Sequence, residues 1–112
     1  MNRLIAVPIE NGILCPHFGH CQQFAIIETD GNTISEERFL VPPPHEPGVI
    51  PAWLASEGVT DIIAGGIGQR AIALFNEKHI NVFVGAPIKN HTDLARDLLN
   101  DTLQAGANYC DH

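Results

Sequence analysis

The proline-rich stretch PPPHEPG, at residues 42–48, is the sequence feature that most constrains the fold. Proline has no backbone N–H and a fixed φ, so this stretch can form neither a helix interior nor an inner strand. It is therefore expected to be a stiff connector. The hydrophobic pattern differs on its two sides: strands are expected before it, and helices that alternate with strands after it.

Three strands are expected before the connector. Apolar, β-prone runs occupy residues 3–9 and 24–29, and residues 33–41 return as a strand whose acids and Arg38 suit an exposed or edge position. The DGN segment at 30–32 favours a hairpin turn, because Gly and Asn accept positive φ. The residues between the first two runs are expected to form a loop.

After the connector, buried-type strands are expected at 60–66 and 81–86. Helices are expected at 50–58, 68–79 and 90–106, the last capped by Thr92 and ended by Gly106. The order β-β-β-α-β-α-β-α predicts an α/β fold with one mixed five-stranded sheet, order 3-2-1-4-5, and helices on both faces. This is the ribonuclease H-like arrangement, formed as a single domain over residues 1–112.

Charge and hydropathy exclude several classes of partner. The net charge is −7, and the six Lys and Arg residues lie far apart in the sequence, whereas a nucleic-acid backbone is bound by clustered bases. No segment approaches the length of a membrane span, and the N-terminus lacks a signal-peptide pattern. We therefore expect a cytoplasmic protein that binds neither nucleic acid nor membrane and whose three cysteines are reduced.

The predicted topology brings three loops to one edge of the sheet. The first, fourth and fifth strands would run parallel, so the loops after them would emerge along the same carboxyl edge, where open α/β sheets bind ligands. These loops are residues 10–23, 65–69 and 85–90.

The first of these loops contains CPHFGHC, residues 15–21, with four potential metal ligands in seven positions. Thiolate and imidazole are the ligands of zinc, copper and iron–sulfur clusters, and the internal proline and glycine prevent a regular helix. We interpret the loop as a metal or metal-cluster site. Its candidate ligands are Cys15, His17, His20 and Cys21.

The spacing of these ligands differs from that of structural zinc sites. Such sites pair ligands as C-x₂₋₄-C, with a second pair elsewhere in the chain. Here the two cysteines are separated by five residues, and a second pair exists only if the C-terminal CDH supplies it through Cys110 and His112. A site of this kind could use the C-terminal tail of the same chain or of a second subunit.

Three other interpretations remain open. Cys21 could be a buried apolar residue that packs with Phe18 and Phe24, while the histidines bond loop carbonyls. Cys21 could instead be a redox or nucleophilic thiol with His17 or His20 as its base, which would make the protein an enzyme. A third possibility is a metal-independent interaction module that pairs through its exposed edge strand or acidic surface.

The glycines Gly65, Gly66 and Gly68 lie between a predicted strand and a predicted helix. They fall short of the dinucleotide fingerprint and of a P-loop. Glycine lets backbone N–H groups approach an anion at a helix N-terminus, so these residues are candidates to bind an anionic cluster; alone, they would be interpreted as a tight turn. Arg70 and Lys89 could add positive charge.

A nuclease with this fold would need carboxylates clustered on the sheet to hold two metal ions. Glu28 and Asp61 have no obvious partners in the sequence, and the first strand has no acid in its interior. The chemistry therefore argues against a nuclease, whatever the fold.

HFGHCQQF at 17–24 and GGIGQRAIALFNEKHINVFVGA at 65–86, with the single-domain length, resemble the dinitrogenase iron–molybdenum cofactor biosynthesis family, which includes NifX-like domains and small stand-alone members. The resemblance implies a ribonuclease H-like fold and a non-catalytic role. That role is to hold or carry an iron–sulfur or molybdenum-containing metal–sulfide cluster between donor and acceptor proteins.

Within the resemblance, the H-F-G-H-C core supplies the best-supported ligand positions, which are His17, His20 and Cys21. Three further candidates lie outside that core: Cys15, Cys110 and His112.

Overall fold

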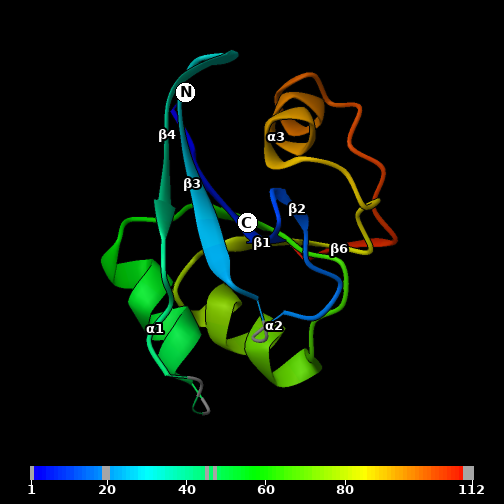
Figure 1. Cartoon of the computed structure of the whole chain (residues 1–112). Coiled ribbons are helices and arrows are strands. Elements are labelled where there is room, and N and C mark those ends of the chain that lie inside the picture. The colour runs from blue at the N-terminus through cyan, green and yellow to red at the C-terminus, as the bar shows by residue number, and fades with distance from the viewer. Residues whose placement is uncertain (1, 19–20, 45, 47, 110–112) are drawn as a thin grey trace.

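The computed structural model describes residues 2–18, 21–44, 46 and 48–109 (Figure 1). In chain order its elements are β1 (Leu4–Glu10), β2 (Ile13–Leu14), β3 (Gln23–Asp30), β4 (Thr33–Leu40), α1 (Val49–Ser56), β5 (Asp61–Ile63), α2 (Gln69–Glu77), β6 (Asn81–Val84), α3 (His91–Leu99) and β7 (Ala107–Tyr109). Within this described part of the chain, no helix is long and apolar enough to cross a membrane.

All seven strands form one mixed sheet in the order β4-β3-β1-β5-β6-β7, and β2 pairs with β1. Strands β1, β5 and β6 are parallel, and the other pairings are antiparallel. The predicted mixed sheet with three helices is confirmed. The predicted count of five strands is wrong because β2 and β7 also belong to the sheet, and the ribonuclease H-like assignment stays a prediction.

Strand β2 lies in the segment that was expected to be a loop. Asn11 and Gly12 form a two-residue turn, both with left-handed φ values, 54° and 83°. The turn pairs Glu10 with Ile13 and folds the chain back along β1. An Asn-Gly pair is the sequence signal for such a hairpin, because both of its turn positions require positive φ. The hairpin sets the starting position of the loop that follows.

Helix α3 ends earlier than predicted, at Leu99 instead of Gly106. Asp101 adopts a left-handed conformation with φ of 62°, and the Thr102 N–H donates to the Asp97 carbonyl over 2.8 Å. This is a Schellman end, in which one left-handed residue lets backbone donors satisfy the last helical carbonyls. The chain then returns along β6 as β7.

The start of α3 also differs from the prediction. The cap is Asn90, whose side chain accepts a hydrogen bond from the Asp93 N–H over 2.8 Å. Thr92, expected to be the cap, donates instead to the Glu37 carboxylate on β4, also over 2.8 Å. The His91 Nε2 lies 2.9 Å from the same carboxylate oxygen. The first turn of α3 therefore fastens the helix to the edge strand β4.

The sheet separates two apolar layers, with α1 and α2 on one face and α3 on the other (Figure 1). Successive side chains of a strand point to opposite faces. In β1, Ile5 and Val7 accordingly pack in the layer of α3, and Ala6 packs in the layer of α1 and α2. The predicted placement of helices on both faces is confirmed.

Asp61, for which the sequence suggested no partner, is buried at the amino end of β5 and is 1% exposed. Its carboxylate accepts hydrogen bonds from the Arg3 guanidinium at 2.9 Å, the Thr60 hydroxyl at 2.7 Å and the Asn81 amide at 3.0 Å. A buried carboxylate needs such partners because its charge is costly to remove from water. The network joins β1, β5 and β6 at the edge opposite the predicted site.

Replacing Asp61 with Ala should destabilise the fold by about 2–3 kcal/mol, because it leaves three donors without their acceptor and Arg3 without its counterion. Urea unfolding at neutral pH measures the effect. Asp30→Ala is the matched control, since Asp30 is an exposed acid of β3 whose loss should change stability by less than about 0.5 kcal/mol. Equal shifts for the two variants would contradict the structural role of the network.

Candidate functional site

The three predicted loops meet at the carboxyl edge of β1, β5 and β6. Short backbone hydrogen bonds join them: Phe18 N–H donates to the Gly66 carbonyl at 3.0 Å, and Gly66 N–H donates to the Pro16 carbonyl at 2.9 Å. The third loop joins through the Leu14 N–H, which donates to the Lys89 carbonyl at 2.9 Å. The predicted convergence of these loops is confirmed.

Gly65 and Gly66 allow the backbones of the first two loops to lie close together. A Cβ on Gly66 would lie 2.9 Å from the Pro16 carbonyl oxygen, and one on Gly65 would lie 3.3 Å from the Pro16 Cα. The Gly66 N–H is already used in this contact, whereas Gly68 is the N-cap of α2 and has open space around it. Tight loop packing therefore explains Gly65 and Gly66, and the predicted binding of an anion by the three glycines stays a prediction.

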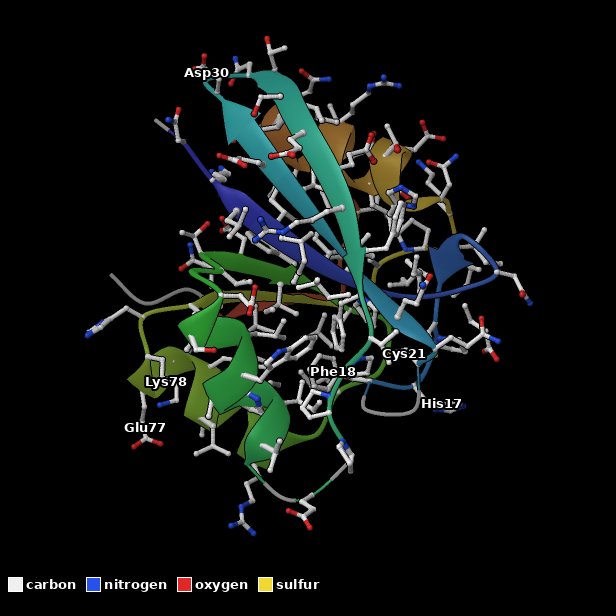
Figure 2. All side chains as sticks on the ribbon, turned by 60° about the vertical axis from the view of Figure 1, so that its left-hand side comes forward. His17, Phe18, Cys21, Asp30, Glu77 and Lys78 are labelled. Atoms are coloured by element: carbon white, nitrogen blue, oxygen red, sulfur yellow. The ribbon has the colours of Figure 1, made fainter. Side chains whose placement is uncertain are left out.

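Phe18 anchors the middle of the loop in the apolar layer between the sheet and helices α1 and α2. Its ring makes edge-to-face contacts with Phe24 and Phe75, with ring centroids 5.7 Å and 5.5 Å apart. Such pairs are favourable beyond the apolar area that they bury. In Figure 2, Phe18 lies toward the helices while the neighbouring His17 is directed outward, and His17 is exposed. The anchored ring therefore fixes the stretch of loop that presents His17 to solvent.

Cys15 lies inside the protein. Its side chain is 2% exposed, its Sγ donates to the His17 carbonyl at 3.4 Å, and its N–H donates to the Pro8 carbonyl at 2.9 Å. Cys21, at the far end of the loop, is half-buried and packs against the α1 and α2 layer with Phe18. Both cysteines are thiols. Of the candidate ligands in the described residues, His17 and Cys21 are therefore those that reach the surface.

The remaining candidate ligands, His20, Cys110 and His112, lie outside the described residues. The last described element is β7. Because Ala107 pairs with Val84 and Tyr109 pairs with Val82, β7 runs away from the carboxyl edge where the loops meet.

Among the described residues, no three His, Cys, Asp or Glu side chains lie close enough together to hold a metal ion. Of the two cations expected to favour an anion, Lys89 is paired with Asp97 at 2.9 Å. Arg70 is exposed in the first turn of α2. A metal site at this edge would therefore need ligands from outside the described residues, from the metal species itself or from a partner.

Sequence reasoning gave Pro16 only the role of preventing a regular helix, and it placed Phe18 beside Phe24 and Cys21 only in the alternative in which Cys21 is a buried apolar residue. The glycine pair was a signal for close backbone approach, but nothing in the sequence indicates that Pro16 is the residue approached. Phe18 lies six residues before Phe24, and both contribute to the layer of α1 and α2.

Comparisons with known proteins agree with this fold. An uncharacterised protein of Methanocaldococcus jannaschii is 36% identical over 84 residues, which cover 70% of this chain and 71% of that protein. The crystal structure of PH0822 superposes with a TM-score of 0.85 at 25% identity and covers 95% of both chains. The apo form of the orange protein from Desulfovibrio gigas gives a TM-score of 0.78 at 20% identity, covering 94% of this chain and 93% of that chain, and shows a shared fold.

A family model described as dinitrogenase iron-molybdenum cofactor matches residues 1–101. The matched region includes the loop at 15–21 and the glycine segment at 65–68 that the structure brings together. The resemblance noted in the sequence is thus confirmed. The chain belongs to the dinitrogenase iron-molybdenum cofactor family.

Proposed function

We propose that this protein binds and carries a metal–sulfide cluster, containing iron and sulfur or molybdenum, during cofactor assembly, and that it does so without catalysis. The observation that carries the proposal is the position of His17 and Cys21. Both lie on a loop that is fastened at the carboxyl edge of the sheet, in a chain of the dinitrogenase iron-molybdenum cofactor family. Imidazole and thiolate are suitable ligands for such a cluster.

Of the loop's candidate ligands that the structure describes, His17 and Cys21 reach the surface and Cys15 is buried. A closed structural metal site has four protein ligands, whereas a site that exchanges its contents keeps a position open. Sulfides of the cluster, or side chains of a donor or acceptor protein, would complete the coordination. An incomplete protein ligand set suits a carrier, because the cluster is never fully enclosed by one chain.

In this proposal Cys15 is a buried residue that supports the backbone of the loop. Its buried Sγ donates to the carbonyl of His17, so it helps to set the backbone from which that imidazole projects. Residues behind the ligands commonly fix ligand orientation in metal sites. Cys15 would coordinate the cluster only if the loop opened and exposed its thiol.

Anaerobic reconstitution of the protein with iron, sulfide and molybdate should produce visible charge-transfer absorption. Cys21→Ser should weaken cluster binding by more than about tenfold, because it removes a thiolate ligand. Cys15→Ser is the matched control: it keeps a donor for the His17 carbonyl and should retain most of the absorption. A colourless wild-type protein, or equal losses in the two variants, would contradict the proposal.

Replacing Cys110 with Ser and His112 with Ala together should leave the absorption and the metal content largely unchanged, because the family resemblance supports the loop residues His17, His20 and Cys21 as ligands more strongly than these two. Metal analysis of protein purified without oxygen measures the outcome. A loss of metal in this double variant would instead show that the tail of the same chain or of a second chain completes the site. Gel filtration of the wild-type protein distinguishes these two sources.

Gly66→Ala should impair cluster binding and destabilise the fold by about 1–3 kcal/mol, because its Cβ would collide with the Pro16 carbonyl oxygen. Gly68→Ala is the matched control. No atom lies within 4 Å of a Cβ placed there, and Gly68 has an ordinary φ of −75°. Its stability should change by less than about 0.5 kcal/mol. Urea unfolding and absorption after reconstitution measure both effects. Equal behaviour of the two variants would contradict the role of the close contact between Gly66 and Pro16.

A further inference from the structure

A cleft of about 330 Å³ lies between the N-terminal halves of α1 and α2, beside the candidate site. The two helices cover the same face of the sheet (Figure 1). This volume is near the lower end of the range of about 300–1,000 Å³ found for small-molecule sites. The lining residues are Phe18, Glu46, Gly48, Ile50, Pro51, Gly68, Arg70, Ala71 and Leu74.

The wall of the cleft is mostly apolar. Phe18 comes from the loop, Ile50 and Pro51 come from the first turn of α1, and Ala71 and Leu74 come from α2. Small-molecule sites typically combine such a wall with a few polar groups that orient the ligand. An occupant of this cleft therefore needs an apolar body.

The polar groups at the cleft favour negative charge. Gly48 and Gly68, the N-caps of α1 and α2, both line it, and neither helix has a side-chain cap or an acid in its first turn. Free N–H groups at a helix N-terminus attract anions. At α1 the Val49 N–H already donates to the Glu46 carbonyl and Pro51 has no N–H, so the donors available to an anion are mainly those of α2. Arg70 adds a full charge and, within the described part of the chain, has no carboxylate partner. By contrast, Arg3 and Lys89 are both held in ion pairs.

We propose that this cleft binds a small organic anion with an apolar body, whose charged group lies against Arg70 and whose body lies against Phe18 and Leu74. Glu46, the one acidic lining residue, is exposed and limits the affinity for an anion. The occupant would touch Phe18, the ring that anchors the candidate metal loop. The proposal goes beyond cluster binding and stands without it, so each can fail separately.

The test uses two fluorescent probes of similar shape, anilinonaphthalene sulfonate, which is anionic, and N-phenylnaphthylamine, which is neutral. The wild-type protein should bind the anionic probe more tightly. Arg70→Gln should weaken the anionic probe about three- to tenfold and leave the neutral probe unchanged, while Glu46→Gln should strengthen the anionic probe. Amide chemical shifts of Gly48 and Gly68 should move on titration.

A second pair of variants tests the location of the binding. Ala71→Leu fills the cleft and should weaken both probes about tenfold, whereas Ala73→Leu, on the exposed side of the same helix, should have no effect. Equal affinities of the wild-type protein for both probes, or no effect of Arg70→Gln, would overturn the proposal. So would chemical shifts centred on a second hollow, of about 230 Å³, at Ile13, Pro16 and Ile88.

Discussion

The candidate site depends on two backbone hydrogen bonds, which Gly66 makes with Pro16 and with Phe18. They join the loop after β2 to the loop after β5. These two loops are far apart in the sequence and meet only in the folded protein. Backbone bonds of this kind need the two chains close together, and a side chain at Gly66 would prevent it. The aromatic contacts of Phe18 then hold the loop from the other side. Together these contacts fix the backbone on both sides of His17, whose side chain is exposed.

The two ends of the parallel strands are held by different kinds of contact. At the amino end, Asp61 is buried with three hydrogen-bond donors, and this network links β1, β5 and β6. At the carboxyl end, the same strands are followed by loops held by glycine packing and a buried thiol. The buried ion pair therefore lies at the end of the strands opposite the candidate site, whose loops are held by backbone and aromatic contacts instead.

Much of the fold could be predicted from local patterns. The apolar runs of β1, β3 and β5, the helices α1 and α2 and the meeting of the three loops followed from hydrophobic periodicity and strand direction. The Asn11-Gly12 hairpin was missed although its signal was present. The end of α3 and strand β7 could not be predicted in the same way. Asp101 ends the helix in a conformation that is decided by its context, and β7 exists only because it pairs with β6, which lies far away in sequence.

The residue types of the candidate site could be predicted from the sequence, but which of its side chains are buried and which are exposed could not. Cys15 and His17 are two residues apart, yet the first is buried and the second is exposed. That difference arises from the register of β2 against β1 and from the contact between Pro16 and Gly66, both of which are tertiary. Spacing alone treated the two cysteines as equivalent ligands, whereas the fold places one of them behind the loop.

Strand β7 has a consequence for association between chains. It covers the free edge of β6, while the opposite edge strand, β4, carries exposed charged residues. Long, uncharged sheet edges pair with other chains, and both a very short edge strand such as β7 and a charged one such as β4 limit this pairing. The family match ends at residue 101, before β7 begins at Ala107. A chain shortened to the matched segment would thus present the backbone of β6 as the edge of the sheet in place of the three-residue strand β7.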